Sequence, residues 1–346
     1  MTVTKQAVLV VCPGRGTYGA NELGYLAQHH AGTPLLSAFD RQRSAQGAEP
    51  VTALDTAQRY STSLHGSGEN AAPLIYAASI LDFLALDPAK VDVVAVCGNS
   101  MGWYTALACA WVISPERGFS IADAMGVNSG HGEPGGQVLL TLVGEDWRPD
   151  PALRHTVERL LAQSGAFRSI ELGGMLLAAG GERELDTLVA ALPPMPGRPP
   201  LRLAGHGPFH TPLMAQSSRR ALAQLPATWF GAPRIPLIDG EGRIWRAKAA
   251  TTAALHHYTF ATQILEPYDF TRSLAVGIKE FAPDRIVLLG AGDTLGGAIG
   301  QVLVAEQWLG IADKAGFAAR QAEEPFLVAM GREDQRTLVT AEAVDD

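Results

Sequence analysis

The chain has 346 residues, a net charge of −8 and 18% charged side chains, an ordinary globular composition with room for a sizeable core. This acidic balance argues against nucleic acid as the main partner, because nucleic-acid binding demands a basic face. There is no run of 18 apolar residues, and the first apolar run, AVLVVC, is too short for a signal peptide, so we expect no membrane span and a cytoplasmic protein.

The three cysteines, Cys12, Cys97 and Cys109, show no spacing typical of a metal site and cannot all form disulfides. We interpret them as buried apolar residues of a reducing compartment. No metal site is therefore predicted.

The first part of the chain alternates apolar strands with helices. Ala7–Cys12 and Val91–Cys97 are continuous apolar runs, typical of buried strands in a parallel sheet. Helical spacing or composition predicts helices over Pro73–Leu86 and Trp103–Ile113. The string Gly98-Asn-Ser-Met-Gly102 lies between the second strand and the second helix, which is the setting of a nucleophile elbow.

The pattern changes over residues 135–204. The expected elements are a strand, a helix, one or two strands, a helix and a last strand: Gln137–Val143, Pro151–Ser164, Ser169–Ala179, Arg183–Leu192 and Pro200–Ala204. This βαββαβ order predicts a small ferredoxin-like subdomain, and Pro and Gly cluster at both of its borders. The α/β pattern then resumes with a strand over Ile286–Leu289 and a helix over Thr294–Leu309.

We therefore predict an α/β fold in which a parallel-sheet, α/β-hydrolase-like large subdomain, residues 1–134 and 205–315, carries the inserted ferredoxin-like subdomain, residues 135–204. Residues 316–346 are charged and weakly periodic, so a loosely packed C-terminal tail is expected.

Ser100 is the candidate nucleophile of the elbow. A serine hydroxyl is a weak nucleophile at its free pKa, so it needs exposure on a tight turn and a nearby base. The backbone N–H of Met101, at the start of the helix, is placed to stabilise an oxyanion. The alternative, a plain turn between a strand and a helix, stays open at this point.

Two further loops supply candidate polar groups. Residues 205–214 carry His206 and His210 in a segment stiffened by prolines, and either histidine is a candidate base or an ordinary solvated loop histidine. The loop after the first strand contains Arg15; it either ends the strand or directs its amides into a pocket at the carboxyl end of the sheet.

These segments resemble the malonyl-CoA:acyl-carrier-protein transacylase family. Its members show PGQGSQ, GHSLGE and a loop ending in FHxxLM, and the matching strings here are PGRGTY (13–18), GNSMGW (98–103) and PFHTPLM (208–214). The segment Gln263–Ser273, with Phe270 where the family has tryptophan, and the turn Leu289–Gly292 extend the resemblance to about residues 7–305.

The resemblance implies an S-acyltransferase of fatty acid or polyketide biosynthesis. It would move an acyl group, malonyl by family default, from acyl-CoA to the phosphopantetheine thiol of an acyl carrier protein through an ester on Ser100. His210 would be the base, oriented by a backbone carbonyl with Gln263 close by, and the amides of Met101 and Arg15 would form the oxyanion hole. His206 would then line the pocket or have a structural role. Acyl-CoA is a substrate, so no cofactor is implied.

Several family positions are changed around the pocket. Asn99 replaces a histidine, Trp103 a glutamate, Ala72 a glutamine and Arg15 a glutamine. These changes alter the shape of the substrate pocket more than they alter the nucleophile.

The family arginine that binds the malonyl carboxylate is also missing. It follows the serine by 25 residues, a position that is Met125 by direct counting and His131 if the string 122–124 is aligned instead. Either the acyl group has no free carboxylate or another cation replaces that arginine, and Arg15 and Arg117 are the candidates.

Two other functions remain open. A thioesterase or other hydrolase would use the same serine and histidine, although α/β-hydrolases follow the order Ser, Asp or Glu, His and lack the inserted subdomain. A catalytically inactive subunit that binds a carrier protein would explain the motif losses, but it would not need Ser100 and His210.

Overall fold

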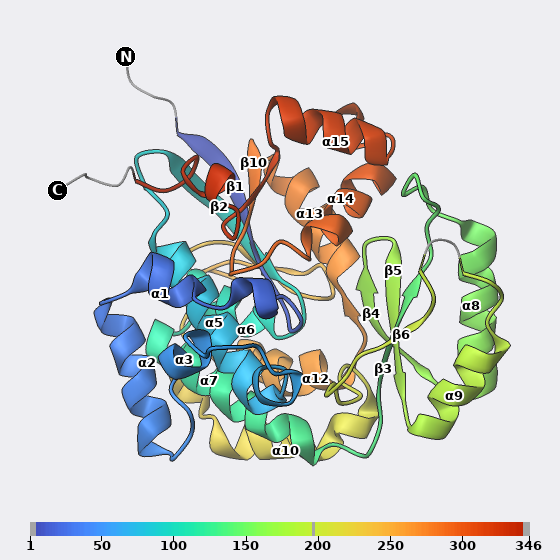
Figure 1. Cartoon of the computed structure of the whole chain (residues 1–346), viewed down its shortest axis with the longest axis horizontal. Coiled ribbons are helices and arrows are strands. Elements are labelled where there is room, and N and C mark those ends of the chain that lie inside the picture. Colours follow the sequence, from blue (N-terminus) through green and yellow to red (C-terminus); the bar gives the residue numbers. More distant parts are fainter. Residues whose placement is uncertain (1–4, 196–197, 342–346) are drawn as a thin grey trace.

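The larger of two sheets forms the centre of the molecule. The structure, a computed structural model, describes residues 5–195 and 198–341 and has a mixed α/β fold (Figure 1). The larger sheet has the strand order β11-β10-β1-β2-β7-β8. All neighbours are parallel except β7 and β8. Its strands are β1 (Gln6–Cys12), β2 (Val91–Gly98), β7 (Leu237–Ile238), β8 (Ile244–Trp245), β10 (Arg285–Leu288) and β11 (Leu327–Ala329).

Side chains of β1 alternate between two hydrophobic clusters, as the period of a strand requires. Val8 and Val10 belong to one cluster, and Leu9 and Val11 belong to the other. The first cluster also contains residues of α5 (Gly68–Leu84), α6 (Gly102–Cys109) and α7 (Pro115–Asn128), and the second contains residues of α13 (Phe270–Phe281) and α14 (Gly296–Ala305). Burial on both faces explains why the predicted strands are continuous apolar runs.

Shorter helices surround this core. They are α1 (Tyr25–His30), α2 (Pro34–Ala45), α3 (Val51–Asp55), α4 (Thr62–His65), α10 (Ala215–Gln224), α11 (Thr252–His257), α12 (Gln263–Leu265), α15 (Lys314–Glu323) and α16 (Glu333–Arg336). No helix in the described part of the chain is long and apolar enough to cross a membrane. The three cysteines are buried and unpaired, as predicted.

The second sheet lies to the right in Figure 1 and has the order β6-β3-β5-β4-β9. Its elements are β3 (Gly136–Thr141), α8 (Pro151–Ser164), β4 (Phe167–Leu172), β5 (Met175–Gly180), α9 (Glu182–Ala191), β6 (Leu201–Arg202) and β9 (Tyr268–Asp269). The predicted βαββαβ order of elements is confirmed. The edge strand β9, which joins parallel to β4, was not predicted because two residues carry no periodic pattern.

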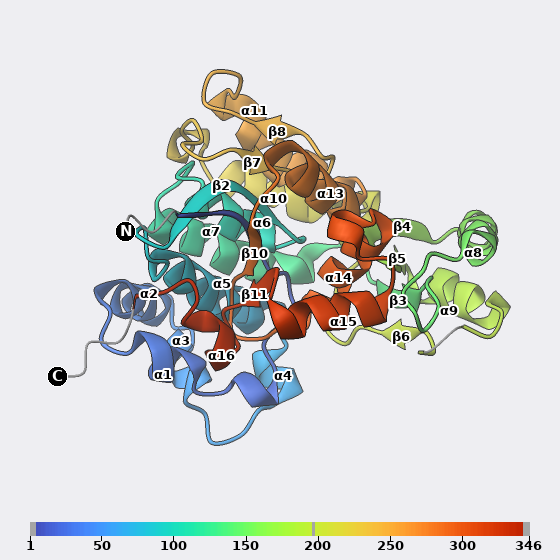
Figure 2. The same cartoon turned by 90° about the horizontal axis from the view of Figure 1, so that it is seen from above.

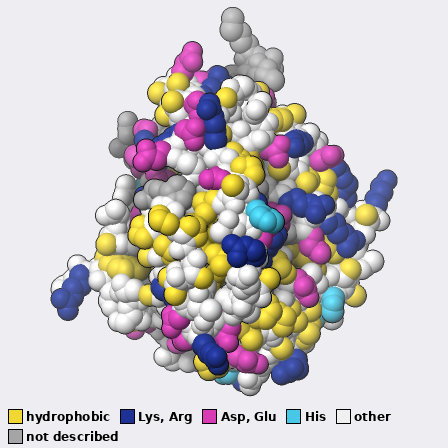
Figure 3. All heavy atoms as spheres, turned by 90° about the vertical axis from the view of Figure 1, so that its right-hand side faces the viewer, with side chains coloured by type: hydrophobic (Ala, Val, Ile, Leu, Met, Phe, Trp, Pro, Cys, Tyr) yellow, Lys and Arg dark blue, Asp and Glu magenta, His cyan; other side chains and the backbone are white. Residues whose placement is uncertain are grey.

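The two faces of the second sheet have different partners. Val138, Leu140 and Leu176 form a separate hydrophobic cluster with α8 and α9. The intervening residues Leu139 and Leu177 project to the other side, toward the larger sheet. The outer surface of this part of the molecule carries basic and acidic side chains side by side (Figure 3).

The prediction of a loosely packed C-terminal tail is wrong for residues 316–341, and residues 342–346 lie outside the described part of the chain. Strand β11 forms the edge of the larger sheet, and α16 lies beside α1, where the chain folds back across the molecule (Figure 2). Arg336 of α16 donates hydrogen bonds to Asp82 (2.7 Å) and to the hydroxyl of Tyr25 (2.7 Å). The charged composition concealed this packing, which combines a short apolar strand in the core with a buried ion pair.

Burial alone would raise the pKa of Asp82, but its hydrogen bond with His30 and the charge of Arg336 outweigh burial and lower that pKa. Arg336→Met would leave the Asp82 carboxylate buried without its cation. We expect this variant to lose about 3–5 kcal/mol of unfolding free energy. Arg332→Met is the matched control, because Arg332 is 49% exposed and pairs with Asp334 at the surface, where an ion pair contributes about 0–1 kcal/mol. Urea unfolding of both variants measures the difference, and equal losses would contradict a buried role for Arg336.

Candidate active site

Ser100 lies on the tight turn between β2 and α6. Its backbone has φ = 54°, in the left-handed region that costs energy for a residue with a side chain. The two flanking glycines permit this path: a Cβ on Gly102 would overlap the carbonyl oxygen of Cys12, and one on Gly98 would overlap the backbone of Gly102. The turn therefore lifts the Ser100 side chain above the carboxyl end of the sheet, as a nucleophile elbow does.

His210 is the histidine that meets this serine. Its Nε2 lies 2.8 Å from Ser100 Oγ, and its Nδ1 lies 2.6 Å from the backbone oxygen of Gln263. A carbonyl oxygen only accepts hydrogen bonds, so Nδ1 carries the proton and Nε2 is free to accept the proton of the serine hydroxyl. The His210 backbone N–H also donates to the carbonyl of Ile264 (2.8 Å), which fixes the loop.

Gln263 contacts both members of this pair. It follows a π-helical turn over Tyr258–Thr262, a deviation that is frequent at functional sites. While its backbone oxygen holds His210, its side-chain Nε2 donates to the backbone oxygen of Ser100 (3.0 Å). Gln263 is thus a buried bridge between the candidate nucleophile and the candidate base.

Burial lowers the pKa of His210 to about 4, although the hydrogen bond to Gln263 opposes this shift. An imidazole with this pKa is neutral at pH 7, as a general base must be.

We expect the rate of Ser100 acylation to be nearly constant from pH 8 to about pH 5.5 and to fall only as the pH approaches about 4, where His210 becomes protonated. A histidine with an ordinary pKa would halve the rate near pH 6.5. The initial rate of adduct formation across this range, measured by mass spectrometry, decides between the two, and a midpoint near 6.5 would contradict the effect of burial.

Two backbone amides of pocket residues are candidates for an oxyanion hole. The N–H groups of Arg15 and Met101 donate no hydrogen bond to any described residue, and both residues line the pocket that contains Ser100. Free amides on either side of a nucleophile are what an oxyanion hole requires.

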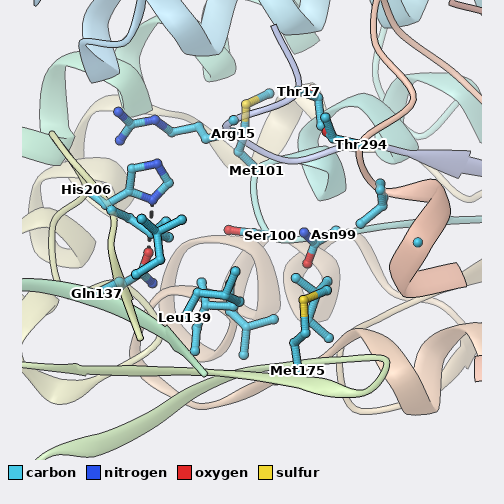
Figure 4. A pocket seen from close by; sticks show the side chains of 18 of the residues that line it. Arg15, Thr17, Asn99, Ser100, Met101, Gln137, Leu139, Met175, His206 and Thr294 are labelled. Atoms are coloured by element: carbon cyan, nitrogen blue, oxygen red, sulfur yellow. Dashed lines mark hydrogen bonds between the residues drawn. The ribbon is translucent and has the colours of Figure 1, made fainter. Parts of the chain in front are cut away.

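The pocket lies between the two sheets and has a volume of about 880 Å³. Figure 4 shows Asn99 and Ser100 near its centre, with Arg15 and His206 on one side. The second sheet contributes a largely apolar wall, which comprises Leu139, Ile170, Leu172, Met175 and Leu177. Asn99, Met125 and His206, predicted as pocket residues, do line it.

Three predicted pocket residues lie elsewhere. Trp103 is fully buried in the core and donates from its indole nitrogen to Thr259 (2.9 Å). His131 follows α7 and contacts the Val127 carbonyl through Nδ1 (3.3 Å), and Arg117 is exposed near the start of α7. These predictions are wrong because Trp103 faces the core, His131 lies beyond the end of α7, and Arg117 lies at the opposite end of α7 from the pocket residue Met125.

The sequence did not identify the pocket residues of the second sheet. Gln137 of β3 accepts a hydrogen bond from His206 and donates one to Ser169 (2.8 Å), whose hydroxyl donates to the backbone oxygen of Phe209 (2.9 Å). The sequence signal for these pocket residues was the segment Gln137–Thr141. Its apolar residues are consecutive and so occupy both faces of a strand, which is typical of a strand that is buried on both sides.

We compared the sequence and the fold of the chain with those of known proteins. The malonyl CoA-acyl carrier protein transacylase of Salmonella typhimurium is 23% identical over 286 residues, which cover 80% of this chain and 89% of that protein. Its namesake from Escherichia coli K12 is 22% identical over the same shares. Over most of its length the chain is thus similar in sequence to malonyl CoA-acyl carrier protein transacylases. No family model matches the chain.

Solved structures show that the malonyl CoA-acyl carrier protein transacylase fold extends over nearly the whole chain. The transacylase of Coxiella burnetii has a TM-score of 0.73 at 15% identity and covers 98% of this chain and 99% of its own. The structure titled MCAT from Mycobacterium tuberculosis has a TM-score of 0.73 at 22% identity, over 96% and 98% of the two chains. A malonyl-transacylase solved in complex with a type II PKS acyl-carrier protein has a TM-score of 0.67 at 20% identity, over 86% and 93%.

Proposed function

We propose that the protein is an acyl-carrier-protein S-acyltransferase that transfers an acyl group from coenzyme A to the phosphopantetheine thiol of a carrier protein. The observation that carries this proposal is the 2.8 Å contact between Ser100 Oγ and His210 Nε2 at the edge of a pocket. The similarity to these transacylases in sequence and fold supports the reaction class. Malonyl is the acyl group that the names of the relatives suggest.

In the first half-reaction, Ser100 Oγ attacks the thioester carbonyl carbon while His210 Nε2 accepts the hydroxyl proton. The amides of Met101 and Arg15 stabilise the oxyanion. The intermediate collapses by breaking the carbon–sulfur bond, and His210 returns the proton to the leaving thiolate. The carrier thiol reverses these steps: His210 takes its proton, the sulfur attacks the ester, and Ser100 is regenerated.

Within this proposal, the larger sheet is an α/β-hydrolase-like subdomain and the second sheet a ferredoxin-like subdomain over residues 135–204. The order β6-β3-β5-β4, with β5 antiparallel to both β3 and β4, supports the second assignment. Pocket residues come from both parts, so an acyl chain on Ser100 would lie between them.

The test follows both products at once. The protein is incubated with malonyl-CoA and a holo carrier protein, and the masses of protein and carrier are recorded together with free malonate. We expect malonyl on the carrier and a transient adduct on Ser100. The apo carrier, which lacks the thiol, is the matched control and should gain no mass.

Release of free acid at the same rate with either carrier form would favour the hydrolase alternative and contradict transfer. A protein that gains no mass from any acyl-CoA would contradict both activities and leave a binding role.

A further inference from the structure

His210 has a strained backbone, as Ser100 does. Its φ is 61°, in the left-handed region that is unfavourable for a residue with a side chain. Such a conformation persists only where the surrounding structure holds it. The contacts of the backbone around His210 therefore decide where its imidazole lies.

The peptide unit between Phe209 and His210 is held from both sides. Its N–H donates to the backbone oxygen of Ile264 in α12 (2.8 Å), and its C=O accepts from the hydroxyl of Ser169 in β4 (2.9 Å). A peptide unit is planar and rigid, so fixing both of its polar groups fixes its orientation. The direction in which the His210 side chain leaves the chain is thus set jointly by α12 and by the second sheet.

Ser169 is the extra residue of a β-bulge in β4. Arg168 pairs with Ala178 of β5, and Ile170 pairs with Leu177, so Ser169 has no residue opposite to it. Bulges redirect side chains and are frequent beside active sites. Ser169 is fully buried and is not among the described residues that line the pocket. Its hydroxyl therefore serves the Phe209 carbonyl and not a ligand.

Gln137 sets the direction of that hydroxyl. Its side-chain Nε2 donates to Ser169 Oγ (2.8 Å), so the single proton of the hydroxyl is left for the Phe209 carbonyl. Its Oε1 accepts from His206 Nδ1 (3.0 Å), the contact drawn as a dashed line in Figure 4. Burial alone does not require such an arrangement. Two other buried serine hydroxyls have no hydrogen-bond partner among the described residues, those of Ser79 and Ser217.

We propose that Ser169 and Gln137 are positioning residues for the general base, through which the second sheet sets the place of His210 Nε2 against Ser100 Oγ. This inference rests on the proposed acyl transfer. Within the described residues, no hydrogen bond joins either side chain to Ser100 or to the His210 ring, so both act through the peptide unit that follows Phe209. The second sheet is then part of the catalytic machinery as well as a wall of the pocket.

Ser169→Ala removes the hydroxyl that holds the Phe209 carbonyl. Single-turnover acylation of Ser100 is followed by intact mass over a range of malonyl-CoA concentrations, which separates the maximal rate from the half-saturating concentration. We expect the maximal rate to fall by about 10- to 100-fold, because a small misplacement of a catalytic group has an effect of this size. The half-saturating concentration should not change, because Ser169 does not line the pocket.

Two further variants accompany it. Gln137→Met retains the Ser169 hydroxyl but removes the donor that directs it, so we expect a smaller loss of maximal rate, about 2- to 10-fold. Thr271→Val is the matched control. The Thr271 hydroxyl accepts from the backbone N–H of Gly173 (2.7 Å) and so also joins the second sheet to the rest of the molecule, but Thr271 is not among the described residues that line the pocket. This variant should keep the wild-type rate.

A double-mutant cycle with His210→Ala distinguishes a positioning role from a structural one. If Ser169 acts through the imidazole, its substitution has no further effect on a protein that already lacks the imidazole. We therefore expect the double variant Ser169→Ala/His210→Ala to be acylated at the rate of His210→Ala. A general distortion of the pocket would instead lower the rate of both backgrounds by the same factor, and that result would overturn the inference.

The remaining outcomes are equally decisive. An unchanged maximal rate in Ser169→Ala, or an equal loss in Thr271→Val, would overturn the inference and leave acyl transfer intact. A change confined to the half-saturating concentration would assign Ser169 to substrate binding and would also overturn it. Urea unfolding reports whether each variant is folded, and if Ser169→Ala is not, an unchanged rate in Gln137→Met overturns the inference. No adduct on the wild-type protein would overturn the proposed function, and this inference with it.

Discussion

Ser100→Ala is expected to abolish acyl-adduct formation with every acyl-CoA. The hydroxyl is the atom that becomes the ester oxygen, and its removal leaves no nucleophile at the turn. The substitution removes one oxygen atom from a half-buried side chain and retains the backbone, so the fold should be unaffected. Intact-mass measurement detects an adduct directly and does not depend on the carrier protein.

The matched control is Ser120→Ala on α7, because Ser120 bonds to Gln42 and Glu116 and lies outside the pocket. It should acquire the adduct at the wild-type rate. Retained labelling in Ser100→Ala would show that another residue carries the acyl group and would contradict the mechanism.

His210→Ala is expected to lower the rate of acylation by about 10²- to 10⁴-fold, the usual contribution of a general base. The loss should affect both half-reactions, because the same Nε2 accepts the proton of Ser100 and that of the carrier thiol. Single-turnover rates with malonyl-CoA, and with the pre-formed acyl-enzyme plus holo carrier, separate the two steps.

His206→Ala provides the comparison. Its Nδ1 bonds to Gln137 (3.0 Å), and no contact joins its ring to Ser100. We expect a much smaller loss of rate. Equal losses of rate in the two variants would contradict the assignment of His210 as the general base.

The sequence predicted well those parts of the fold that depend on local patterns. Continuous apolar runs identified β1, β2 and β10, and glycines 98 and 102 marked the elbow because the turn cannot accept side chains there. The pairing of Ser100 with His210 required the family resemblance, since 110 residues separate them and no local pattern joins them.

Other features could not be read from local pattern. Trp103 and Arg117 are near pocket residues in the sequence, but Trp103 is buried in the core and Arg117 is exposed outside the pocket. Helix periodicity alone did not reveal which side of each helix faces the pocket. The C-terminal segment packs through the short strand β11 and through a buried ion pair whose two residues are 254 positions apart in the sequence. Charged residues in a weakly periodic segment gave no sign of that contact.

The Arg336 network also bears on the order in which the molecule is made. Strand β1 is synthesised long before two of the strands on its side of the larger sheet, β10 and β11. Asp82 accepts hydrogen bonds from Gly290 and from Arg336, so its carboxylate gains these two partners only after both distant segments have been synthesised. Contacts of such long sequence separation fold slowly. The elbow that carries Ser100 is thus encoded in the first third of this sequence, yet the sheet beneath it is completed only after β11 has been synthesised.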